Sequence, residues 1–222
     1  MLILGIDDAG RGPVVGPMVL AGCLIDEKTE KEFKKLGVKD SKMLTAKRRE
    51  FLAEEIRKKS EMFEIVLAHP IEIDGTNSHG INLNKLEALK AAEIINKINK
   101  GFKELKVIID CPSVSIFKWK DFLKTKIENL SNLTFVVEHK ADKNYIAVSA
   151  ASILAKSERE KEMDKLREKY GKEIGSGYCS DPLTCNFLEK HAKKHEEDGI
   201  FRRTWSTWKK ACARLSQKKL FL

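Results

Sequence analysis

Four aspartates are the residues of this sequence best suited to chemistry, because each lies where an apolar run ends. Asp7 and Asp8 follow the run 2–6, Asp110 closes the run 105–110, and Asp142 comes shortly after the run 133–139. In open α/β sheets, ligands bind beyond the carboxyl ends of the strands. We therefore expect the four carboxylates to converge from three segments. A single carboxylate at a strand end is more often a cap or turn residue, so the adjacent pair carries this prediction.

Carboxylates that are packed together need a compensating cation, because each negative charge raises the pKa of the others. All four groups are hard oxygen donors, and no His or Cys lies beside them at a ligand spacing. Such a set favours Mg²⁺ or Mn²⁺ over zinc. Two ions about 4 Å apart activate a water molecule and stabilise the leaving oxygen in phosphodiester cleavage. The aspartates therefore predict a hydrolytic site with two divalent ions.

A glycine-rich turn follows the first two aspartates directly. Gly10 and Gly12 flank Arg11. Glycines allow the backbone to approach a ligand closely, and their N–H groups bind an anion or a sugar hydroxyl. The arginine side chain is suited to gripping a phosphate. The alternative is an ordinary glycine turn, which the position after Asp7 and Asp8 makes less attractive.

The composition indicates a protein with a hydrophobic core and a basic surface. Of 222 residues, 42% are hydrophobic and 34% are charged, and the net charge is +9. This excess is typical of a protein that binds nucleic acid, or of the charged surface of a heat-adapted protein. The five cysteines contain no Cys-x-x-Cys pair, so we expect reduced thiols. We find no signal segment or membrane-spanning run and expect a cytoplasmic monomer.

Strands alternate with helices along most of the chain. We predict strands at 2–6, 14–25, 63–69, 105–110 and 133–139, and helices at 45–60, 83–101, 115–130 and 145–170. Pro, Gly and Asn predict a loop at 70–82, and Asp181-Pro182 predicts a helix start. This order indicates an α/β fold with a mixed sheet. We place the catalytic domain at 1–172 and a helical C-terminal region at 173–222.

Several long motifs resemble those of the ribonuclease HII family, in the order of that family. They are GIDDAGRGPVVGPMVLAG, LGVKDSKMLT, IIDCPSV, EHKADKNYIAVSAASILAKSERE and GSGYCSDP. The resemblance covers almost the whole chain and is greatest to archaeal members. It implies a ribonuclease H-like mixed five-stranded sheet flanked by helices, with a helical C-terminal region.

The resemblance also implies an activity. It implies endonucleolytic cleavage of RNA in RNA–DNA hybrids, and incision on the 5′ side of a lone ribonucleotide in duplex DNA. The products would carry 3′-hydroxyl and 5′-phosphate ends.

The resemblance assigns roles to individual residues. It implies that Asp7, Asp8, Asp110 and Asp142 are the catalytic metal ligands. It implies that Gly10, Arg11, Gly12 and Tyr178 sense the ribonucleotide, of which only the 2′-hydroxyl distinguishes RNA from DNA at one position. Further candidates for holding flanking phosphates are Lys42, Ser149 and Lys156, for which solvation or helix capping is the alternative.

At one position the chain departs from the family pattern. Asp8 stands where the motif has Glu, and Asp reaches about 1.5 Å less because it lacks one methylene. Metal–ligand distances tolerate only about ±0.2 Å. We therefore hypothesise reduced activity, or a shifted preference between Mn²⁺ and Mg²⁺, relative to an Asp8→Glu variant.

The C-terminal tail has a second interpretation. Gln217, Leu220 and Phe221 resemble a shortened motif for binding a sliding clamp, and a tail that orders in an apolar groove is physically reasonable. The alternative is a frayed basic terminus or a tail packed on its own domain.

Two other functions use the same features differently. A nuclease or resolvase acting on all-DNA junctions needs the carboxylates but neither the glycine turn nor Tyr178. A catalytically silent protein, with Asp8 as the lesion, binds duplexes through charge and does not cut. Duplexes with and without a ribonucleotide, tested with and without metal, discriminate among the three.

Overall fold

The computed structural model describes residues 1–39 and 44–218. Their elements, in chain order, are β1 (Ile3–Ala9), β2 (Met18–Ile25), α1 (Glu27–Leu36), α2 (Ala46–Lys59), β3 (Met62–Ala68), α3 (Pro70–Ser78), α4 (Leu83–Ile98), β4 (Leu105–Asp110), α5 (Ile116–Lys124), β5 (Leu133–Glu138), α6 (Ala141–Asn144), α7 (Ile146–Tyr170), the 3₁₀ helix η2 (Lys172–Ile174), α8 (Pro182–His191) and α9 (Ser206–Lys218). The helix predicted at 145–170 is therefore confirmed as α7.

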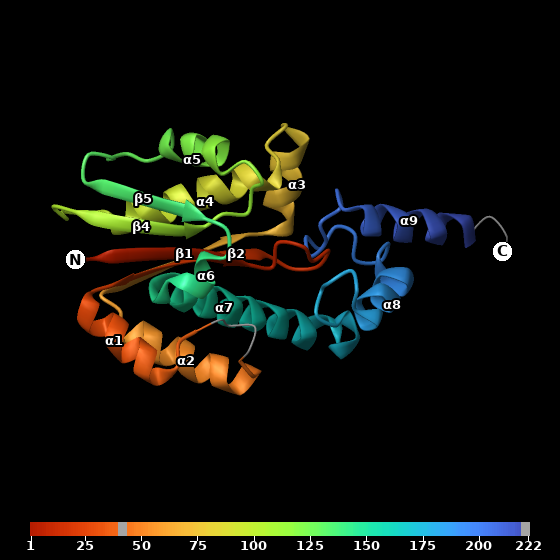
Figure 1. Ribbon diagram of the computed structural model, residues 1–222. Coiled ribbons are helices and arrows are strands. Elements are labelled where there is room, and N and C mark those ends of the chain that lie inside the picture. The colour runs from red at the N-terminus through yellow and green to blue at the C-terminus, as the bar shows by residue number, and fades with distance from the viewer. Residues whose placement is uncertain (40–43, 219–222) are drawn as a thin grey trace. The chain divides into compact units, whose positions relative to one another are not determined.

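The five strands form one mixed sheet in the order β3-β2-β1-β4-β5 (Figure 1). β1 pairs with β2 in antiparallel fashion and with β4 in parallel, and β4 pairs with β5 in parallel. The predicted mixed five-stranded sheet is confirmed. Because β1 and β4 are parallel neighbours, their carboxyl ends, which carry Asp7, Asp8 and Asp110, lie at the same edge of the sheet.

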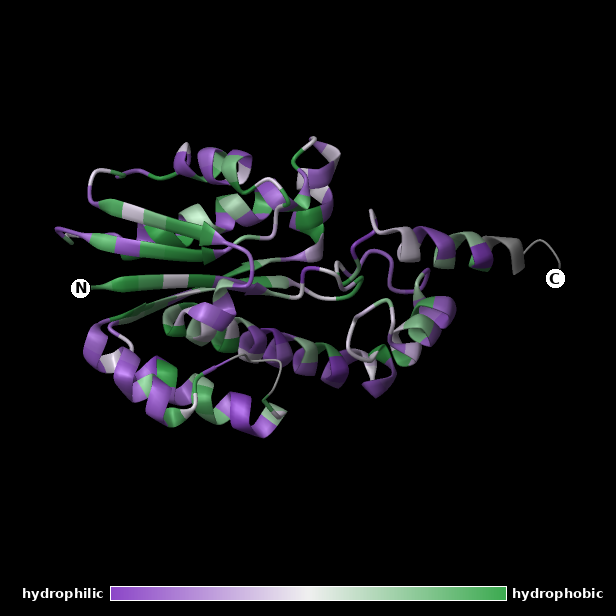
Figure 2. Cartoon of the chain, viewed as in Figure 1, coloured by the Kyte–Doolittle hydropathy of each residue, from purple (hydrophilic) through white to green (hydrophobic). Residues whose placement is uncertain are grey.

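Helices cover both faces of this sheet (Figure 1). On one face, Phe33 of α1, Leu52 of α2 and Leu154 of α7 pack with inward side chains of β2 in one buried cluster. α4 and α5 cover the other face, where Ile94 of α4 packs on Gly22 of β2. Figure 2 shows hydrophobic strands between helices that alternate hydrophobic and hydrophilic residues, the pattern of elements that bury one side.

A close contact fixes α7 against the middle of β1. A Cβ atom added to Gly5 would lie 2.1 Å from the backbone carbon of Ala147. No side chain fits there, so glycine is what allows the helix to approach the strand. The first turns of α7 are thereby held beside the strand that carries Asp7.

The chain divides into two compact units, which we describe separately. Unit 1 comprises 1–9, 19–67 and 83–158 and contains nearly all of the sheet. Unit 2 comprises 10–18, 68–82 and 159–222. The core of unit 2 includes Val14, Met163, Phe187, Phe201 and Trp208. The predicted domain boundary at residue 172 stays a prediction.

Three local predictions differ from the structure. The segment 70–82 was predicted as a loop, but it contains α3, with Pro70 in the first turn, where its missing N–H costs nothing. The strand predicted at 14–25 begins only at Met18. α1 was not predicted, although Asp26 caps it by accepting from the Thr29 N–H at 2.7 Å.

Other local predictions are confirmed. Thr45 caps α2, and Asp181 caps α8 by accepting from the Leu183 N–H at 3.0 Å.

Among residues 1–39 and 44–218, no helix has the length and apolar character required to cross a bilayer.

Candidate functional site

β1 carries Asp7 and Asp8 as strand residues rather than in a following turn. Both pair with β2, opposite Ala21 and Leu20. Successive side chains of a strand point to opposite faces of the sheet, so the two carboxylates diverge. Asp7 is buried on the α7 face, and the N–H of Asp8 donates to Asp7 Oδ1 at 2.8 Å. The carboxylates of Asp7 and Asp8 therefore lie on opposite faces of the sheet.

Asp110 and Asp142 approach Asp7 from neighbouring segments. Asp110 is the last residue of β4, and its Oδ1 accepts from the N–H of Lys140 at 2.8 Å. Lys140 adopts the left-handed conformation, with φ 60°, and so turns the chain from β5 into the short helix α6. Asp142 lies buried in α6. The turn at Lys140 thus links the positions of both carboxylates.

Asp7, Asp110 and Asp142 form a carboxylate cluster. Each offers an oxygen, and these oxygens lie within 4.8 Å of one another. Burial, with the charges of Asp8 and Asp110, raises the pKa of Asp7 well above its usual range, although a hydrogen bond with Ser152 opposes this shift. Three oxygen donors that repel one another fit a divalent cation, which removes the repulsion. The cluster therefore fits a divalent-metal site, and its predicted occupation by Mg²⁺ or Mn²⁺ stays a prediction.

Asp8 is not part of this group among the described residues. It lines a small cavity with Asp7, Asp110, Glu87 and Trp119. Its predicted role as a metal ligand stays a prediction. Glu87 is a buried acid of α4 that the sequence analysis missed, with 1% of its surface exposed. The sequence signal that could have revealed Glu87 is its position among apolar residues on one face of the helix predicted at 83–101.

The predicted ribonucleotide sensors lie in unit 2. Gly10–Gly16, which we call the glycine loop, contains Gly10 with φ +79°. A Cβ atom at Gly10 would lie 2.3 Å from Arg159 Nε, so this position requires glycine for conformation and for space. The backbone N–H groups of Val14 and Val15 donate to the Gly177 carbonyl at 2.9 and 3.2 Å. The loop is therefore joined to the segment that carries Tyr178.

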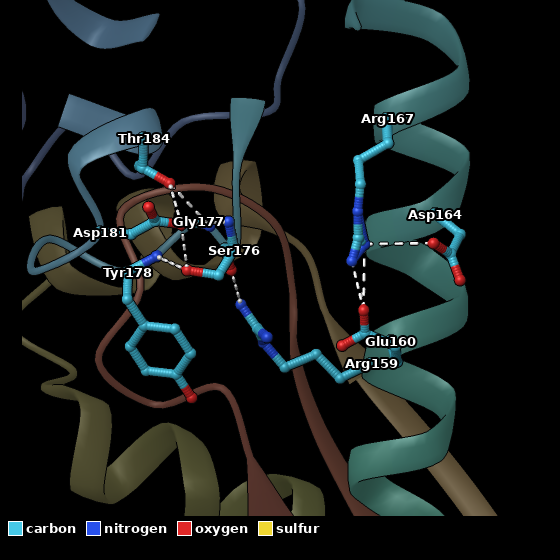
Figure 3. Close-up of polar contacts among 9 residues, drawn as sticks. All are labelled: Arg159, Glu160, Asp164, Arg167, Ser176, Gly177, Tyr178, Asp181 and Thr184. Atoms are coloured by element: carbon cyan, nitrogen blue, oxygen red, sulfur yellow. Dashed lines mark hydrogen bonds and ion pairs between the residues drawn. The ribbon is translucent and has the colours of Figure 1, made fainter. Parts of the chain in front are cut away.

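Tyr178 is accessible and rests on a buried cation. Its side chain is 41% exposed, and the Arg159 guanidinium lies 4.9 Å from the centre of its ring. Figure 3 shows the arginine beside the ring, with Nη2 donating to the Ser176 carbonyl at 3.0 Å. Asp181 accepts from the Ser176 N–H and hydroxyl, each at 2.7 Å. These contacts hold the ring beside Arg159 while leaving it accessible.

The predicted phosphate contacts have other partners. The buried Ser149 hydroxyl donates to the Asp142 carbonyl at 2.5 Å, which corresponds to the helix-capping alternative and supports the turn that carries Asp142. Lys156 Nζ donates to Ser152 Oγ at 3.1 Å, so it lies next to the residue that bonds Asp7. Lys42 lies outside the described residues.

The predicted clamp motif falls largely outside the described residues. Gln217 lies within the bounds of α9, near its end. Leu220 and Phe221 lie beyond the part of the chain that the structure describes. The motif therefore remains a prediction from sequence.

Comparison with known proteins gives a consistent set of relatives. The family model for ribonuclease HII matches residues 4–208. A ribonuclease HII from Methanocaldococcus jannaschii is 42% identical over 234 residues and covers 100% of both chains. The crystal structure of ribonuclease H2 from Pyrococcus horikoshii is 38% identical, with a TM-score of 0.87, and the match covers 98% of this chain and 100% of that one. These matches confirm the ribonuclease H-like fold.

One further match is to a protein in an assembly. The ribonuclease HII of Archaeoglobus fulgidus, solved in complex with PCNA, is 38% identical to this chain. It superposes with a TM-score of 0.80, and the match covers 93% of this chain and 96% of the relative.

Proposed function

Because the chain belongs to the ribonuclease HII family, we propose that it incises duplex DNA on the 5′ side of a lone ribonucleotide, with two divalent ions held by its carboxylates. Family membership already makes the chain a ribonuclease H, an endonuclease that degrades RNA in RNA–DNA hybrids. The observation that carries the proposal is the carboxylate cluster, whose oxygens lie within 4.8 Å of one another.

The cluster residues would hold the ions, and Asp8 would complete the set. Divalent ions bound there supply activation of a water molecule and stabilisation of the leaving oxygen. The chain itself keeps the donors in place. Ser152 bonds Asp7, the Lys140 N–H bonds Asp110, and Ser149 braces the Asp142 backbone. The positions of the three ligands are thereby set before any ion binds.

The position of the cut explains why the ribose is recognised rather than used as a reactant. Incision on the 5′ side breaks the bond between phosphorus and the 3′ oxygen of the preceding nucleotide. Water supplies the new oxygen of the 5′-phosphate, and the departing oxygen becomes a 3′-hydroxyl. The ribonucleotide's own 2′-hydroxyl lies on the far side of its sugar from that phosphate. We therefore assign this hydroxyl to recognition by the glycine loop and Tyr178.

Four substrates and three metal conditions test the proposed function. The substrates are duplex DNA with one ribonucleotide, an RNA–DNA hybrid, plain duplex DNA and a branched DNA junction, each with Mg²⁺, Mn²⁺ or EDTA. We expect metal-dependent nicking on the 5′ side of the lone ribonucleotide, with 3′-hydroxyl and 5′-phosphate ends. Cutting of the branched DNA alone would favour a resolvase, and binding without cutting would favour the silent protein.

We also propose that the C-terminal tail binds a sliding clamp. The A. fulgidus relative was solved with PCNA, and Gln217, Leu220 and Phe221 resemble a clamp-binding motif. Deletion of 217–222 should abolish binding to PCNA and leave nicking of a short duplex unchanged. Clamp binding by the truncated chain at full affinity would end this proposal.

A further inference from the structure

A fully buried arginine in unit 2 holds the glycine loop. Arg202 is 0% exposed, and its guanidinium donates to three loop carbonyls. Nη2 donates to Gly10 O at 2.6 Å and to Gly16 O at 3.0 Å, and Nη1 donates to Arg11 O at 2.7 Å. Nε donates to Gly16 O at 3.2 Å. One side chain therefore binds both ends of the loop.

The shape of the guanidinium matters for this arrangement. Its donors form a rigid planar fork, whereas a lysine ammonium is a compact charge that cannot match several carbonyls at fixed positions. Burial, with the charge of Arg159, lowers the pKa of Arg202 to about 10. The group therefore remains protonated at neutral pH, and the loop carbonyls compensate its buried charge.

Neighbours of Arg202 complete the hold on the loop. The Arg202 N–H donates to Val14 O at 2.8 Å, and Gly16 N–H donates to Ile200 O at 2.9 Å. Trp205 Nε1 donates to Gly12 O at 3.3 Å, and the Arg202 guanidinium lies 5.2 Å from the centre of the Trp205 ring. The carbonyls of Gly10, Arg11 and Gly12 thus all accept from the segment 202–205. This orientation directs the acceptors of the loop toward the protein.

We infer that Arg202 is a positioning residue for ribose recognition, which it serves by fixing the loop with its carbonyls inward. The inference rests on the proposed function of the loop. With its carbonyls engaged by Arg202 and Trp205, the loop recognises a ligand through backbone N–H groups and the Arg11 side chain. The N–H groups of the loop therefore donate hydrogen bonds to the oxygen of the 2′-hydroxyl, which acts as the acceptor. Tyr178 belongs to the same unit, because Gly177 accepts from Val14 and Val15.

Binding without catalysis isolates this role. We would measure the affinity of the full chain, in EDTA, for duplex DNA with one ribonucleotide and for the same duplex without it. The ratio of the two affinities is the ribose discrimination. In Arg202→Lys the charge remains but the fork is lost, so we expect discrimination to fall about tenfold, the scale of one or two lost charged hydrogen bonds. Affinity for plain DNA should stay within about twofold, because charge governs it.

The matched control is Arg203→Lys. The neighbouring Arg203 side chain is exposed and pairs with Glu197 at 2.9 Å. This variant should retain full discrimination. If Arg202→Lys does not fold, Trp205→Phe decides, because it removes the donor to Gly12 O and keeps a ring. We expect it to lower discrimination about threefold, as for one neutral hydrogen bond.

The outcomes separate the inference from the proposed function. Unchanged discrimination in a folded Arg202→Lys protein, or in Trp205→Phe if the first variant is unfolded, overturns the positioning role. A wild-type protein that binds both duplexes equally overturns ribose reading by the loop. In that case the nicking assay with four substrates decides whether the proposed activity also fails.

Discussion

The carboxylate cluster and the glycine loop reach opposite solutions to the burial of polar groups. In the cluster, like charges crowd together, and the pKa of Asp7 rises because burial and its neighbours disfavour ionisation. In the loop, a buried cation is surrounded by carbonyls that already satisfy it. The first site is therefore electrostatically incomplete without a cation, whereas the second is complete as folded. Under the proposed function, the first site keeps its repulsion until an ion binds, and the second is rigid before the ribose arrives.

The largest expected effect is on catalysis, when one carboxylate of the cluster loses its charge. Asp110→Asn removes a charge that would hold an ion, and we expect the rate of RNA–DNA hybrid cleavage to fall about 100-fold or more. The measurement is single-turnover cleavage with Mg²⁺ and with Mn²⁺. The matched control is Asp121→Asn, at an exposed position of α5, which should cleave at the wild-type rate. Equal rates for the wild type and Asp110→Asn would exclude the cluster as the catalytic centre.

A smaller effect tests the ribose-reading side of the comparison. Tyr178→Phe keeps the ring over Arg159 and removes the hydroxyl. We expect nicking at a lone ribonucleotide to slow about three- to tenfold, the net value of one hydrogen bond.

The control for Tyr178→Phe changes the same atoms elsewhere in unit 2. Tyr170→Phe removes a hydroxyl that donates to Asp198 at 3.0 Å. It should lower thermal stability slightly and leave nicking unchanged. If both tyrosine variants slow nicking equally, the slower nicking by Tyr178→Phe results from a general change in unit 2 and not from loss of a contact to the ribose.

Asp8→Glu tests whether the length of this side chain limits metal binding. The longer side chain extends the carboxylate by about 1.5 Å, one carbon–carbon bond. We expect the rate to rise a few-fold and the midpoint of the Mg²⁺ titration to shift relative to that of Mn²⁺. Asp8→Asn separates the effect of charge from that of length and should lower the rate. Identical metal titrations for the wild type and the Asp8→Glu variant would contradict the hypothesis that the shorter Asp8 side chain changes the metal preference.

The smallest effect is on stability and depends on whether metal is present. A raised carboxyl pKa stabilises the folded state only at acidic pH, and this contribution is lost as pH rises through the folded-state pKa. At neutral pH, burial of the ionisable Asp7 carboxyl beside Asp8 and Asp110 therefore destabilises the metal-free protein relative to a neutral amide. In EDTA, Asp7→Asn should raise Tm by about 2–4 °C, which is about 1 kcal/mol for a chain of this size.

Added Mg²⁺ completes this test. It should raise the Tm of the wild type, because an ion that binds the folded state stabilises it, and it should have little effect on the variant. A wild-type Tm that does not respond to Mg²⁺ would indicate that the cluster does not bind it.

Local patterns in the sequence predicted most of the elements but not all of their ends. Thr45 and Asp181 marked helix starts because capping is a local interaction. The segment 70–82 was misassigned because its Pro, Gly and Asn suggested a loop, although Pro70 stands in a first turn where a helix accepts it. β1 was predicted to end before Asp7, yet pairing with β2 extends it to Ala9. Strand ends depend on the partner strand, which a local pattern does not contain.

By itself, the sequence determined the strand and helix order, the family and the residue types of both sites, because apolar periodicity and long motifs are written along the chain. Tertiary structure alone decided that Asp7, Asp110 and Asp142 share one space while Asp8 faces the other side of β1. It also decided the place of Arg202, which in the sequence looks like a surface arginine. Burial of a charge depends on carbonyls that come from the other end of the chain, and only folding brings them to it.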